Sequence, residues 1–124
     1  MSLANQALLY NLALLGTTVD DDLIAFSGGT QSGAVPVRSE AARVIGGVLN
    51  SSLVLKSITS GEASQLTFVV NDGPNAIKVF CAPGETLNGG ANGSLAIPAG
   101  QSGIFVRVPN ALSAGGDWRA AAIP

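Results

Sequence analysis

The sequence lacks histidine and has one cysteine, six basic residues and few aromatic side chains. Without an imidazole, a Ser-His-Asp triad, a Cys-His dyad and a His-ligated metal site are excluded within this chain. The single cysteine, Cys81, excludes an internal disulfide and a zinc knuckle. We interpret Cys81 as a small buried apolar residue, because a reactive thiol needs a cationic neighbourhood. The inventory therefore predicts no metal, no cofactor and no enzymatic activity.

Charged residues are also scarce, at 11% of the chain against about 25% in ordinary soluble domains. Six Lys and Arg residues with a net charge of −2 are too few to form a basic patch, so no nucleic-acid partner is expected. No apolar run reaches the ~18 residues of a membrane helix. The first basic residue is Arg38, so a secretory signal is not expected either. These features predict cytosolic synthesis and no membrane contact.

The chain is rich in apolar residues, at 47%, and has 16 glycines among its 124 residues. A chain of this length buries about two thirds of its unfolded surface, and its hydrophobicity argues against disorder. We expect an N-terminal arm and a Gly/Ser-rich hinge over residues 1–37, followed by a β-body over residues 38–124.

The N-terminal segment is the first candidate for an association surface. Residues 1–37 contain three aspartates and no Lys or Arg, and we expect a solvated turn at Asp20–Asp22 with a weak attraction for basic partners. Residues 3–15 fit a helix that is apolar on all sides, and such a helix must be buried. It would pack against another subunit, or it would lie on a neighbour as an extended arm. The candidate partner-binding residues here are Leu3, Leu8, Leu9, Leu12 and Leu15.

From residue 38 onward the signals are those of β-structure. Alternating apolar residues predict strands over 66–70 and 77–81, joined as a β-hairpin by the Asn71–Asn75 turn. Turn clusters recur about every 8–12 residues, which is typical of sandwiches and barrels. We therefore predict an all-β fold, an antiparallel β-sandwich (jelly-roll-like) or a barrel, and we detect no internal sequence repeat.

Two further features are candidates for a site. The only tryptophan, Trp118, suits a core plug, an interface anchor or a sugar-stacking platform, and we include it among the candidate partner-binding residues. Carboxylates are scattered along the body, and a glycosidase would need two of them roughly 5–10 Å apart across a cleft. These carboxylates are Glu40, Glu62, Asp72, Glu85 and Asp117.

Residues 66–119 resemble a pattern found in small β-rich accessory virion proteins of tailed phages and prophages. A Val-Asn-x-Gly turn leads into a short strand with an aromatic residue, within Val69–Phe80. An acidic-Thr-x-Asn-Gly loop follows within Pro83–Gly89, then an Ala-Gly turn at Ile97–Gly100 and an apolar strand at Ile104–Val106. The first 60 residues show no such resemblance.

The resemblance implies a structural role in the virion. Such proteins decorate capsids, often as trimers at local symmetry axes, with arms that reach adjacent subunits. The implied function is a capsid decoration (cement) protein that binds the major capsid protein on the phage head surface after synthesis in the bacterial host cytoplasm. Two alternatives remain open. One is a tail or fibre component that contacts a host glycan or another tail protein, and the other is a small carboxylate-only glycoside hydrolase.

Overall fold

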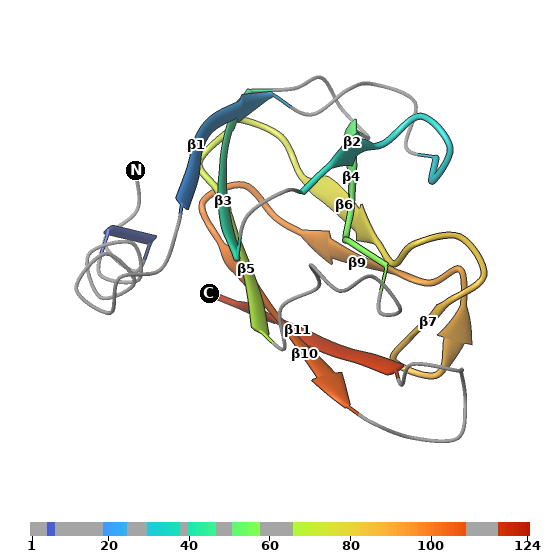
Figure 1. Cartoon of the computed structure of the whole chain (residues 1–124). Helices are drawn as coiled ribbons and strands as arrows, with labels where there is room; N and C mark the ends of the chain where they lie inside the picture. The colour runs from blue at the N-terminus through green and yellow to red at the C-terminus, as the bar shows by residue number, and fades with distance from the viewer. Residues whose placement is uncertain are drawn as a thin grey trace.

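The structure, a computed structural model, places the described strands in two sheets (Figure 1). The all-β prediction is confirmed, and the two sheets form a sandwich-like fold. Neither sheet closes into a barrel among the described strands. The structure describes residues 5–6, 19–24 (backbone only), 30–37, 40–46, 51–57, 66–108 and 117–124.

The two sheets differ in size, and each begins with an N-terminal strand at its edge. The larger sheet has seven strands, in the order β1 (Val19–Ile24), β3 (Ala41–Gly46), β5 (Leu66–Asn71), β10 (Ser102–Val108), β11 (Asp117–Ile123), β7 (Thr86–Leu87) and β8 (Gly90–Ala91). The smaller sheet has four, in the order β2 (Val35–Pro36), β4 (Ser51–Val54), β6 (Ile77–Phe80) and β9 (Ser94–Ile97).

The first six strands alternate between the sheets and form three stacked β-arches. β1, β3 and β5 pair in parallel in the larger sheet, while β2, β4 and β6 pair in parallel in the smaller one. Antiparallel pairing begins with β7 and β8, and β9 and β10 then pair antiparallel with β6 and β5. The predicted antiparallel sandwich is therefore corrected to one with two mixed sheets. The arches repeat in the structure but not in the sequence. Positions that pair with one another, such as Val19, Ala41 and Phe68, are unequally spaced along the chain, so the sequence has no fixed period.

The predicted β-hairpin of residues 66–81 is wrong, although both of its strands exist. β5 pairs with β3 and β10, whereas β6 lies in the other sheet and pairs with β4 and β9. The connection between them is a β-arch, which passes from the larger sheet to the smaller one. Alternation shows which side chains of a strand are buried, but a hairpin and an arch give the same alternation.

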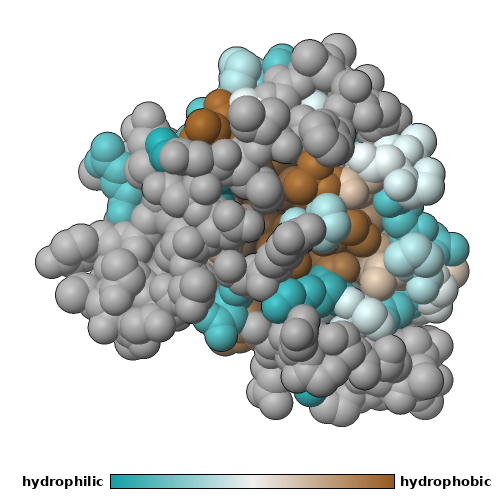
Figure 2. Space-filling model, turned by 45° about the horizontal axis from the view of Figure 1, so that its top comes forward, coloured by the Kyte–Doolittle hydropathy of each residue, from teal (hydrophilic) through white to brown (hydrophobic). Residues whose placement is uncertain are grey.

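The core lies between the sheets. It is formed by buried apolar side chains from both sheets. On the face shown in Figure 2, apolar side chains are visible in the middle of the view, with hydrophilic ones around them. Gly103 of β10 permits close approach of the sheets, because a Cβ atom there would lie 2.6 Å from Cδ1 of Ile97. Burying each large apolar side chain contributes roughly 1.5–3 kcal/mol. The largest buried apolar residues include Val44, Leu53, Val69, Val79, Ile97, Phe105 and Trp118.

The residues predicted as arm and hinge contribute strands to both sheets. β1 and β2 lie within residues 1–37, so the strands of the body begin at Val19. Asp20–Asp22 lie in β1 rather than in a turn, because pairing with β3 outweighs the low strand preference of aspartate. The Gly/Ser-rich segment is attached to the body: Nε2 of Gln31 donates to the carbonyl of Cys81 at 2.7 Å.

The N-terminal helix prediction falls mostly outside the described residues. Asn5 and Gln6 have helical backbone conformation. They lie on the side of the larger sheet that faces away from the smaller one (Figure 1). No helix among the described residues is long and apolar enough to cross a membrane.

Candidate functional site

The outer face of the larger sheet, which points away from the core, is unusually apolar. Strand register and alternation place on it every second residue of β3, β5, β10 and β11. An outer sheet face is ordinarily polar, so an apolar one indicates that something covers it. Its residues include Ala41, Arg43, Ile45, Leu66, Phe68, Val70, Ser102, Ile104, Val106, Arg119, Ala121 and Ile123.

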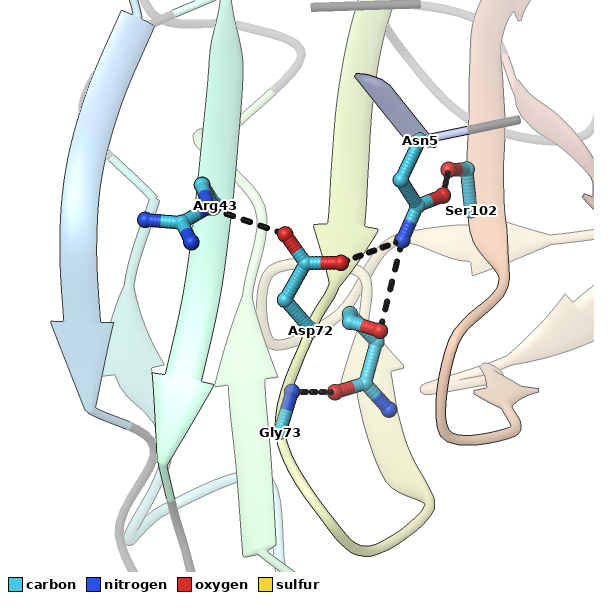
Figure 3. Close-up of polar contacts among 6 residues, drawn as sticks. Asn5, Arg43, Asp72, Gly73 and Ser102 are labelled. Atoms are coloured by element: carbon cyan, nitrogen blue, oxygen red, sulfur yellow. Dashed lines mark hydrogen bonds and ion pairs between the residues drawn. The ribbon is translucent and has the colours of Figure 1, made fainter. Parts of the chain in front are cut away.

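This outer face has a buried part and two exposed large apolar residues. Ala41 and Val70 are completely buried although they lie outside the core cluster, and Ser102 is nearly so. Leu66 and Ile45, in contrast, have 47% and 37% of their surface exposed, and the strand register places them toward opposite ends of the face. The buried part is the place where Asn5 rests on the sheet (Figure 3).

Asn5 is completely buried, and its carboxamide forms hydrogen bonds with residues of the body. Its Nδ2 donates to Oδ1 of Asp72 at 2.8 Å and to the carbonyl of Asn71 at 3.4 Å. Its Oδ1 accepts the hydroxyl of Ser102. We call Asn71, Asp72 and Ser102 the amide socket, because together they offer two acceptors and one donor to a single carboxamide.

The socket is held in place by contacts of the body. Asp72 has 3% of its side chain exposed, and its Oδ2 pairs with Nε of Arg43 at 2.9 Å. The side chain of Asn71 donates at 2.9 Å to the carbonyls of Asn75 and Ile97 and accepts the amide of Gly73. Asn71 therefore fixes the arch, ties it to β9 and presents its own carbonyl to Asn5. A buried polar group with all its bonds made specifies one arrangement of the chain.

A second cluster of buried polar residues surrounds Cys81. The thiol is buried and its Sγ lies 3.4 Å from the carbonyl of Glu85, to which it donates. Burial raises the pKa of Cys81 because it disfavours the thiolate, and the nearby charges of Glu85 and Asp117 raise it further. The interpretation of Cys81 as a small buried residue is confirmed.

The structure brings two of the five candidate carboxylates into one neighbourhood. Glu85 accepts the hydroxyl of Ser57 at 2.5 Å, and Asp117 accepts that of Thr86 and pairs with Nε of Arg119 at 2.6 Å. Asp72 belongs to the amide socket instead. Glu40 lies just before β3, and Glu62 falls outside the described residues. Among described residues, no group of three His, Cys, Asp or Glu side chains could hold a metal ion.

The predicted partner-binding residues fall into two groups, one described by the structure and one outside the described residues. Trp118 is 1% exposed and belongs to the core. This burial agrees with the core-plug interpretation, and we correct its place among the partner-binding candidates because a buried ring offers no surface to a partner. The predicted association leucines lie outside the described residues, namely Leu3, Leu8, Leu9, Leu12 and Leu15.

Sequence reasoning missed the amide socket, although two signals for it were present. Residues 66–70 and 104–106 are apolar on both strand faces, which indicates that β5 and β10 are covered on both sides. Asn5 is a polar residue inside an apolar segment, and buried polar side chains require partners.

Comparison with known proteins does not identify a relative. No protein-family model matches the chain, and searches of curated proteins and of solved structures found no significant match. Its function must therefore be inferred from its own residues.

Proposed function

We propose that this chain is a capsid decoration protein of a tailed phage, a structural protein that binds the major capsid protein on the outside of the head. The observation that carries the proposal is the apolar outer face of the larger sheet, which holds the seat of the N-terminal segment and, toward its two ends, the exposed residues Ile45 and Leu66. An outer sheet face that is apolar and partly covered by an N-terminal segment is typical of an interaction site. The virion-protein resemblance of residues 66–119 supports the same role.

The physical effect of such a protein on a shell follows from mass action. A protein that binds the assembled shell better than free subunits shifts the equilibrium toward the assembled state. If the protein is a trimer, as the resemblance implies, three linked contacts bind far more tightly than one. No catalytic step is needed, which suits a chain without histidine.

The described residues lack the features that would favour either alternative function. Glycan binding by a tail component calls for exposed aromatic rings, but no aromatic side chain among the described residues is exposed, Trp118 included. A hydrolase needs two carboxylates that face a substrate, whereas Glu85 and Asp117 are buried and bonded to hydroxyl groups of the chain.

Sedimentation with phage heads tests the proposal. Purified protein is mixed with heads of the encoding phage that lack it, and the heads are pelleted. We expect the wild-type protein to pellet with the heads and to raise their melting temperature, and Leu66→Ser to reduce the bound fraction. Ala96→Ser is the matched control, because Ala96 is an exposed residue of the smaller sheet. A wild-type protein that stays monomeric and never pellets with heads would show that the proposal is wrong.

A further inference from the structure

The amide socket is a binding site that the body builds by itself. The Arg43–Asp72 pair and the bonds of the Asn71 side chain hold its walls, and none of them involves Asn5. Ala41 and Val70, buried on the same face, provide an apolar surface close to these polar groups. The socket can therefore keep its shape while the segment that carries Asn5 is exchanged.

The socket selects a primary carboxamide. Its occupant must donate to the carboxylate of Asp72 and the carbonyl of Asn71, and it must accept from the hydroxyl of Ser102. An aspartate there would place a second carboxylate against Asp72, and an alanine would leave buried polar groups without partners. Any occupant must thus present an asparagine-like side chain on an apolar segment, and the N-terminal segment of this chain does so.

Chain connectivity does not require that a socket be filled by its own N-terminus. Asn5 contacts residues that lie 66, 67 and 97 positions away in the sequence. The stretch between Gln6 and Val19 spans about 40 Å when extended. A compact domain of this length is roughly 35 Å across. The N-terminus of one copy can therefore reach the socket of an adjacent copy.

We propose that the amide socket also receives Asn5 of a second copy of this chain, so that adjacent copies exchange their N-terminal segments. Exchange replaces each intramolecular contact by the same contact between copies, so it links protomers without a new interface. It becomes favourable at the high local concentration of protomers on a shell. This inference rests on the proposed function for its setting, but its test needs only the purified chain.

Cross-linking of mixed single-cysteine variants tests the exchange. All variants carry Cys81→Ala, so that the introduced thiol is the only one. One chain carries Gln6→Cys, beside Asn5, and the other carries Ile104→Cys, on the outer face two residues after Ser102. The two are unfolded together, refolded at high concentration and treated with a short thiol-reactive cross-linker. We expect several-fold more interchain product than with the control pair, in which Ala96→Cys replaces Ile104→Cys.

Two further variants make every outcome informative. A chain with both Gln6→Cys and Ile104→Cys should cross-link within itself, which verifies that the two positions are neighbours. Adding Asn5→Ala to the Gln6→Cys chain should reduce the interchain product to the level of the control pair. If interchain product stays at that level with Asn5 present while the double variant closes on itself, exchange is refuted. A double variant that cross-links neither within nor between copies would refute the placement of Asn5 in the socket, and exchange with it. Shell sedimentation could still succeed in that case, so the two proposals fail separately.

Discussion

The two faces of the larger sheet are both apolar, but they are covered by different means. On the inner face, Phe105 and Trp118 pack against the smaller sheet, with apolar side chains on both sides. On the outer face, the described cover is one polar residue, Asn5, held by hydrogen bonds. Apolar packing fixes the fold without directional contacts, whereas the amide socket binds only a matching group. The inner face thus holds the body together, and the outer face holds Asn5 through matched polar contacts.

A pair of phenylalanine truncations gives the largest expected difference between the faces. Phe105→Ala removes a completely buried inner ring and should lower the free energy of unfolding by about 3–5 kcal/mol. Phe68→Ala removes a half-buried outer ring and should lower it by less than half as much. Urea unfolding followed by circular dichroism measures both. Equal losses would show that the two faces do not differ in this way.

Asn71 belongs to both faces, because its side chain bonds to Ile97 of the smaller sheet and its carbonyl accepts from Asn5. Asn71→Ala leaves buried carbonyl groups without donors and should lower the free energy of unfolding by about 2–3 kcal/mol. It should also weaken attachment of the N-terminal segment, seen as faster proteolysis before residue 19. If stability falls while proteolysis is unchanged, the arch and the socket are independent.

Removing the outer contact alone should have a smaller effect on the fold. Asn5→Ala leaves Asp72 and Ser102 without their amide partner and should lower the free energy of unfolding by about 1–2 kcal/mol. The β-type circular dichroism spectrum should be retained. The matched control is Gln6→Ala, at an exposed position, which should change stability by less than about 0.5 kcal/mol. Unfolding of the body by Asn5→Ala would instead place the N-terminal segment in the core.

The inner side can also be probed by pH, through the Cys81 thiol. Its pKa is raised above 9.0, chiefly by burial. Below that pH the thiol is protonated in both states and its contribution is constant. Above it the unfolded chain loses a proton that the folded chain keeps, so the free energy of unfolding falls by at most ~1.4 kcal/mol per pH unit. Denaturation at a series of pH values should show this component in the wild type and not in Cys81→Ala. An identical pH dependence in both proteins would contradict the assignment.

The strands of the body could be located from sequence, but their partners could not. Alternating residues such as Leu66, Phe68 and Val70 located β5, and the same pattern located β6 and β10. The hairpin prediction failed because adjacent strands paired with earlier arches instead of with each other. The amide socket was missed because its parts are far apart in the chain, and no local signal joins Asn5 to Asp72 or Ser102.

Local chemistry alone determined the all-β class, the buried Cys81 and the absence of every site that requires histidine, because composition and alternation act within a few residues. Left-handed turns at Asn88 and Asn92 also follow from residue type. Only the tertiary structure decided that the arches stack in parallel, that Trp118 lies in the core, and that a carboxamide from the N-terminus meets a socket on the far side of the larger sheet. Each of these is a contact between distant segments, and its free energy exists only once the sheets have assembled.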